Sequence, residues 1–142
     1  MDQLFTYFQA FQKLSQEAET AIAEICQITR IKKNQDLQPI GHTCKTIYFI
    51  NKGIARIYYY KDETDITEGF YFENSIIARV ESLFTGKPSR KAIQVLEDAE
   101  IVGINVSGLF GLYDQFHEIE RLFRKIFETA YVDTVNRIEG IQ

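Results

Sequence analysis

KTIYFINKGIARIYYYKDETDITEGFYF, residues 45–72, is the stretch that decides the fold of this 142-residue sequence. It is rich in β-branched and aromatic residues, and two short polar segments, 51–53 and 61–65, interrupt it. This pattern predicts three successive antiparallel strands joined by tight turns, and Gly53 is expected to supply a positive φ in the first turn. The surrounding range 31–105 continues the pattern and predicts a β sandwich or barrel.

Residues 1–30 have a helical pattern instead. Apolar residues recur at spacings of three and four in the first segment, at Leu4, Phe8, Phe11 and Leu14. Ser15 is a candidate N-cap for a second helix, on which Ala18, Ile22, Ile25 and Cys26 share one face. Two helices that pack on the core are therefore expected before the β zone.

Residues 106–142 are predicted to be helical again. Ser107 is a candidate cap for a short helix, and a longer helix starts near Glu118. A heptad seam on that helix, predicted to form a homodimer, consists of Phe127, Tyr131, Thr134, Ile138 and Ile141. A second apolar stripe, expected to pack on the β zone, consists of Ile119, Leu122, Ile126 and Ala130. The alternative is one broad stripe that faces the core, with no dimer.

Composition restricts the function. The length fits one domain, 1–142, and a net charge of −4 disfavours a surface that grips nucleic acid. The sequence shows neither a membrane span nor the pattern of a secretory signal, which suggests a cytoplasmic location. Two cysteines without a CxxC motif and two distant histidines predict no metal site, no iron–sulfur cluster and no enzyme.

The order of helices, β zone and long helix, together with three motifs, resembles the effector domain of the Crp/Fnr family of transcription regulators. The motifs are LQPIGH at 37–42, TIYFINKG at 46–53 and ESLFTGKPSRKA at 81–92. The resemblance implies the cyclic-nucleotide-binding fold, an antiparallel double-stranded β-helix (jelly roll) with N-terminal helices and a long C-terminal dimerisation helix. It also implies that DNA is contacted only through a helix-turn-helix domain that is absent from this chain.

In that family the third motif is a phosphate-binding cassette, which begins with a Gly-Glu pair and ends with Arg, Ser or Thr, and Ala. Here Arg90, Lys91 and Ala92 occupy the ending, whereas Arg79 and Val80 stand where the Gly-Glu pair belongs. The resemblance therefore implies that the phosphate half is kept and the ribose half is lost. A slip of one residue would bring Glu81 to the ribose position, although an extended segment would need a bulge there.

The basic residues of this loop suggest a general anion site. Arg79, Lys87, Arg90 and Lys91 would form it with Ser89, and the alternative is a solvated basic loop. By the resemblance, Ala130 and Thr134 stand where the family's base-contacting side chains lie. The sequence thus predicts a sensor domain whose ligand is a small anion, in which binding of cyclic AMP or cyclic GMP is doubtful. The alternative is a structural dimerisation module without a ligand.

Overall fold

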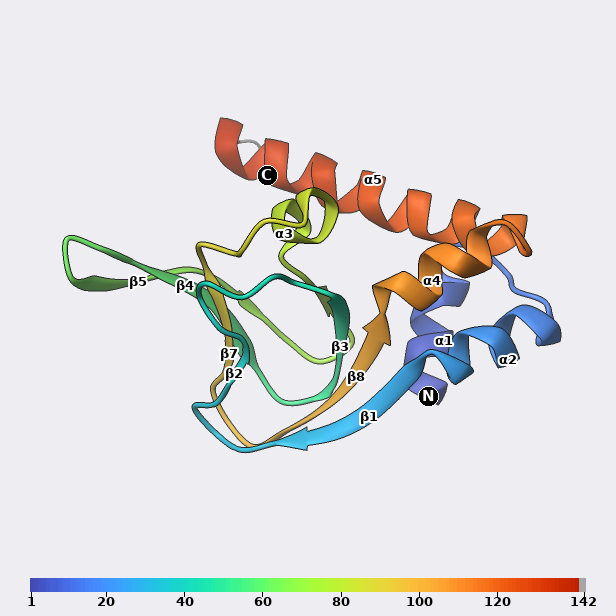
Figure 1. The fold of residues 1–142 in the computed structure, drawn as a ribbon, viewed down its shortest axis with the longest axis horizontal. Coiled ribbons are helices and arrows are strands. Elements are labelled where there is room, and N and C mark those ends of the chain that lie inside the picture. Colours follow the sequence, from blue (N-terminus) through green and yellow to red (C-terminus); the bar gives the residue numbers. More distant parts are fainter. Residues whose placement is uncertain (141–142) are drawn as a thin grey trace.

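The protein forms two antiparallel four-stranded sheets that pack face to face, with helices at one end and along one side (Figure 1). The computed structural model describes residues 1–140. One sheet has the strand order β1-β8-β3-β6, and the other has the order β2-β7-β4-β5. The strands are β1 (Cys26–Ile31), β2 (Asp36–Gln38), β3 (Thr46–Lys52), β4 (Ala55–Lys61), β5 (Thr64–Tyr71), β6 (Ile76–Ile77), β7 (Ala92–Val95) and β8 (Ala99–Asn105). The helices are α1 (Asp2–Gln9), α2 (Gln16–Glu24), α3 (Val80–Thr85), α4 (Val106–Tyr113) and α5 (His117–Glu139). The predicted jelly roll with flanking helices is confirmed.

The three strands predicted from residues 45–72 are β3, β4 and β5. Gly53 joins the first two strands with φ 114°, and a Cβ at this glycine would lie 2.7 Å from the Cβ of Ala99. The next turn places Asp62 and Glu63 at φ 52° and 65°, the left-handed geometry of a two-residue hairpin. Both predicted turns are therefore confirmed.

Alternation along β3 creates two apolar cores. Ile50 points between the sheets, where it packs with residues such as Ile57, Ile93 and Ile101. The neighbouring Phe49 faces the other way, into a larger cluster beneath α1, α2, α4 and α5. Because successive side chains of a strand point to opposite faces, one face of this sheet packs on the other sheet and the opposite face packs on the helices.

The N-terminal boundary differs from the prediction. Residues 1–30 were expected to be helical, but α2 ends at Glu24 and β1 begins at Cys26. Cys26 and Ile31 pair with Ile104 and Ala99 of β8. The helical spacing of Ile25 and Cys26 is overridden because a β-branched segment here completes the sheet. The predicted cap of α2 is confirmed, since the Ser15 hydroxyl accepts from the Ala18 N–H.

The C-terminal helices contain two further corrections. Asn105, not Ser107, caps α4, and its side chain accepts a hydrogen bond from the Gly108 N–H at 2.7 Å. On α5 the buried residues are Ile119, Leu122, Phe123 and Ile126. Ala130, expected on the same buried stripe, is exposed. The helix leaves the helical layer after its first three turns, so its later residues have no core beneath them.

Candidate functional site

The predicted cassette forms a compact loop between β6 and β7. Its short helix α3 ends at Gly86, which has φ 73° and so reverses the chain. The loop surrounds a cavity of about 400 Å³ beside β4. The cavity is lined by Tyr59, Tyr60, Arg79, Glu81, Ser82, Thr85, Lys87, Pro88, Ser89, Arg90 and Lys91. The structure thus brings all the predicted loop residues to one cavity, whereas Thr134 lies elsewhere.

Two buried serines fix the shape of the loop. The Ser82 hydroxyl accepts from the Cys44 N–H at 2.8 Å and donates to the Lys87 carbonyl. The Ser89 hydroxyl donates to the Lys91 carbonyl at 2.7 Å. Because these bonds are buried and made within the protein, the loop keeps its form without a ligand.

Arg79 and Lys91 converge on one carboxylate. The Lys91 ammonium lies 2.7 Å from Oε1 of Glu68, and the Arg79 guanidinium lies 4.0 Å from its Oε2. Arg79 also donates to the Ser89 hydroxyl at 3.3 Å. Lys91 lies over the ring of Tyr59, 4.9 Å from its centre, which adds a cation–π contact. Two cations and one anion therefore form the cluster, which leaves a net positive charge.

Arg90 and Glu81 lie at the outer edge of the loop. Their side chains approach to 3.3 Å, and that of Arg90 is 84% exposed. Glu81 belongs to the first turn of α3, not to an extended segment, so the bulge needed to bring it to a ribose position is not formed. This pair is a solvated ion pair of the kind that contributes little to stability.

Sequence reasoning missed Glu68. It lies on β5 and is the extra residue of a β-bulge, since Ile57 pairs with Gly69 but Tyr58 pairs with Thr67. Bulges are frequent next to functional sites because they redirect side chains. Gly69, a lone glycine within a strand pattern, was the available signal of this bulge.

A second cavity of about 670 Å³ lies between α5 and the strands β5 and β6. Thr134 lines it, but its hydroxyl donates to the Ala130 carbonyl within the helix. Asp133 lines it as well, and burial together with this carboxylate raises the pKa of Tyr7 on α1. Arg79 lines both cavities, so its side chain stands between them.

The predicted heptad seam on α5 lies on the surface. Tyr131 and Ile138 are 70% and 80% exposed, and Thr134 is exposed too. Phe127 is half-buried and contacts Phe84 of α3, with ring centres 5.5 Å apart. Ile141 of the predicted seam lies outside the described residues. The alternative prediction, one broad apolar stripe that faces the core along the whole helix, is therefore wrong for the C-terminal half of α5.

Residues 1–140 contain no group of three or more His, Cys, Asp or Glu side chains positioned to hold a metal ion. Burial raises the pKa of the Cys26 thiol to about 11, which disfavours a reactive thiolate.

Within residues 1–140, no helix has the length and apolar character that crossing a bilayer requires.

Solved structures with the same fold include cyclic-nucleotide-binding domains and transcription regulators. A cyclic nucleotide-binding domain from Methylobacillus flagellatus matches 98% of this chain and 82% of its own, at 12% identity and a TM-score of 0.81. The N-terminal domain of a Streptomyces coelicolor transcriptional regulator matches 96% and 95%, at 14% identity and a TM-score of 0.72.

The Catabolite Activator Protein of Thermus thermophilus matches 91% of this chain, which spans 61% of that protein, at 12% identity and a TM-score of 0.73. Protein-family models and curated proteins gave no match. At these identities the likeness shows the fold, and the chain therefore has the cyclic-nucleotide-binding fold expected from the Crp/Fnr resemblance.

Proposed function

We propose that this chain is the effector domain of a cytoplasmic Crp/Fnr-type transcription regulator and that it senses a small anion at the cassette loop. Structural neighbours that are transcription regulators support the class of protein. Arg79, Ser89 and Lys91 form the centre of the site, and Arg90 lies at its rim. DNA would be contacted by a separate domain that follows α5.

Arg79 is the observation that carries the proposal. Its side chain is only 17% exposed, yet within residues 1–140 it makes one hydrogen bond, of 3.3 Å, and one ion-pair contact, of 4.0 Å. A guanidinium has five N–H donors, and those of Arg79 that the protein leaves without a partner are accessible from the cavities that the side chain lines. An anion in the cavity would satisfy them, and this favours an anion site over a solvated basic loop.

Binding of anions can be measured by calorimetry and by NMR chemical-shift titration. We expect inorganic phosphate to bind at millimolar concentration. Cyclic AMP and cyclic GMP are expected to bind no more tightly, because Arg79 and Val80 replace the Gly-Glu pair and Glu81 is turned toward Arg90. The variant Lys91→Gln should lose binding, whereas Lys52→Gln, which removes the same charge from an exposed site, should not. Absence of any response to phosphate in the native chain would overturn the anion site.

The second candidate is a dimerisation module that binds no ligand. The exposed apolar side chains of Tyr131, Val132 and Ile138 on α5 favour it. Both candidate functions include a homodimer, formed through Phe127, Tyr131, Thr134 and Ile138 of α5. Sedimentation velocity should show a dimer that Tyr131→Glu dissociates and that Thr20→Glu, with the same change of charge on α2, leaves intact. A native monomer at high concentration would contradict the dimer; a dimer that binds no anion would favour this second candidate.

A further inference from the structure

Among residues 1–140, Glu68 is the one carboxylate that contacts both cations at the centre of the proposed anion site. Its two oxygens are divided between them, with Oε1 on Lys91 and Oε2 toward Arg79. A ligand anion would require the same two cations. Glu68 lines the neighbouring second cavity and not the cassette cavity, and from there it supplies the negative charge that a ligand would have to replace at the two cations.

We propose that Glu68 is a resident counter-ion, which neutralises the two cations of the anion site and which a ligand must displace from them. The inference rests on the proposed function, because it assigns a role within the same site. The bulge in β5 supports it, since Glu68 has no pairing partner on β4 and is free of the constraints of the ladder. The carboxylate is also 42% exposed, so it can swing into solvent when it is displaced.

This competition determines the class of ligand. Glu68 is attached to the protein, so its effective concentration at the two cations exceeds that of any free monoanion. A ligand with a single negative charge gains little by replacing it. A phosphate monoester carries about two negative charges at neutral pH and gains more from Arg79 and Lys91. The site therefore selects phosphate monoesters over carboxylates and over phosphodiesters, which include cyclic nucleotides.

Methyl phosphate and dimethyl phosphate separate these classes, because they differ by one charge and one methyl group. Titrated into the native chain at about pH 8, where a monoester is fully ionised, methyl phosphate should bind and dimethyl phosphate should not. Glu68→Gln keeps the size of the side chain and removes its charge. We expect it to bind methyl phosphate about tenfold more tightly and to acquire measurable binding of dimethyl phosphate.

Glu73→Gln is the matched control, because Glu73 is an exposed carboxylate just beyond β5 and its loss changes the net charge equally. It should bind as the native chain does. If the native chain and Glu68→Gln bound methyl phosphate with equal affinity, the counter-ion role of Glu68 would be overturned, but the proposed anion site would not. Failure of both chains to bind either phosphate would overturn the proposed function as well. Thermal unfolding of each variant shows that it is folded, and Glu68→Asp, whose shorter side chain reaches less far, should give an intermediate affinity.

Discussion

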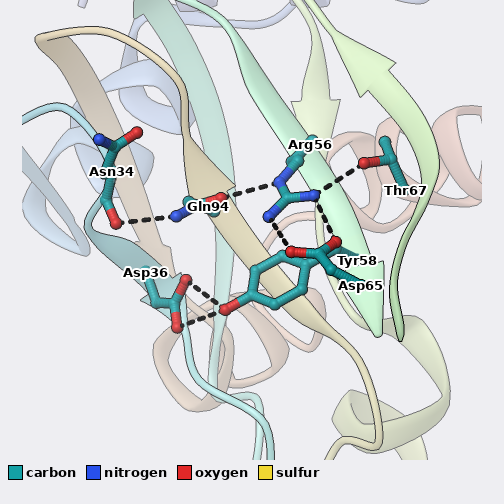
Figure 2. Close-up of polar contacts among 7 residues, drawn as sticks. All are labelled: Asn34, Asp36, Arg56, Tyr58, Asp65, Thr67 and Gln94. Atoms are coloured by element: carbon teal, nitrogen blue, oxygen red, sulfur yellow. Dashed lines mark hydrogen bonds and ion pairs between the residues drawn. The ribbon is translucent and has the colours of Figure 1, made fainter. Parts of the chain in front are cut away.

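Arg56 and Arg79 are two arginines of similar burial whose surroundings differ. Their side chains are 16% and 17% exposed. Arg56 on β4 has hydrogen-bond partners on the two neighbouring strands, β5 and β7 (Figure 2). It donates to Gln94 at 2.7 Å, to Thr67 at 2.8 Å and to both oxygens of Asp65 at 2.7 and 2.9 Å. Arg79 has the loose contacts described above, which lie at 3.3 and 4.0 Å.

The comparison separates a structural arginine from one that is available to a ligand. The guanidinium of Arg56 lies 4.2 Å from the centre of the Tyr58 ring, and the Tyr58 hydroxyl in turn donates to Asp36 at 3.0 Å. These contacts connect β2, β4, β5 and β7, so they tie the whole second sheet together (Figure 2). Burial alone would not have distinguished the two arginines; the number and length of their hydrogen bonds do.

The largest effect on stability is expected at Arg56. Replacement by Met keeps the length of the stem and removes every donor, so Asp65, Thr67 and Gln94 lose a shared partner. We expect the free energy of unfolding in urea to fall by about 2 kcal/mol, because several of these bonds are charge-assisted but lie at a solvated face. Phosphate binding at the cassette should not change. A loss of binding with no loss of stability would reverse the roles assigned to the two arginines.

Arg79→Met should have the opposite effect: it should weaken phosphate binding and leave the free energy of unfolding nearly unchanged. Its single long hydrogen bond and distant ion pair predict a loss of less than about 1 kcal/mol in the free energy of unfolding. Removal of the guanidinium should weaken phosphate binding by about tenfold or more, as measured by calorimetry. Arg79→Lys is the control for charge. It should bind phosphate better than Arg79→Met but less tightly than the native chain, because an ammonium cannot make the paired hydrogen bonds of a planar guanidinium. A loss of stability as large as that of Arg56→Met would show that Arg79 is structural.

Local patterns were sufficient to predict most of the fold. The period of two and the turn residues of 45–72 identified β3, β4 and β5, because each signal lies within a few residues of the strand it defines. The end of α2 was misplaced because Ile25 and Cys26 satisfy a helical spacing, while the competing signal is their distant partner β8. Pairing between residues nearly eighty positions apart leaves no local trace.

The site was predicted only as a set of loop residues. Arg79, Ser89 and Lys91 lie in one motif, so their proximity could be inferred from the chain itself. Glu68 and the partners of Arg56 come from other strands, and their contacts depend on register and on a bulge that a single sequence does not reveal. The predicted role of Thr134 depended on position in a resemblance, and in the structure its hydroxyl is bonded to its own helix.

The smallest expected effect is a dependence of stability on acid pH at the Arg56 cluster. Hydrogen bonds from Arg56 lower the pKa of the Asp65 carboxyl below its ordinary value of 3.8. A lowered folded-state pKa contributes stability that is present above the unfolded value and is lost as the pH falls through the folded value. Asp65→Asn should therefore be less stable than the native chain at neutral pH, and this difference should shrink once the pH falls below 3.8.

Urea unfolding of both chains across the acid range measures this difference, with Asp62→Asn at the exposed hairpin tip as the control. Arg56→Met provides a second check, because without the guanidinium nothing lowers the pKa of Asp65 and the acid-dependent difference should disappear. A difference between native chain and Asp65→Asn that stayed constant with pH would mean that the pair contributes through hydrogen-bond geometry alone. In that case the charge of Arg56 would matter less than its shape, and the contrast with Arg79 would depend only on the number of donors each arginine has satisfied.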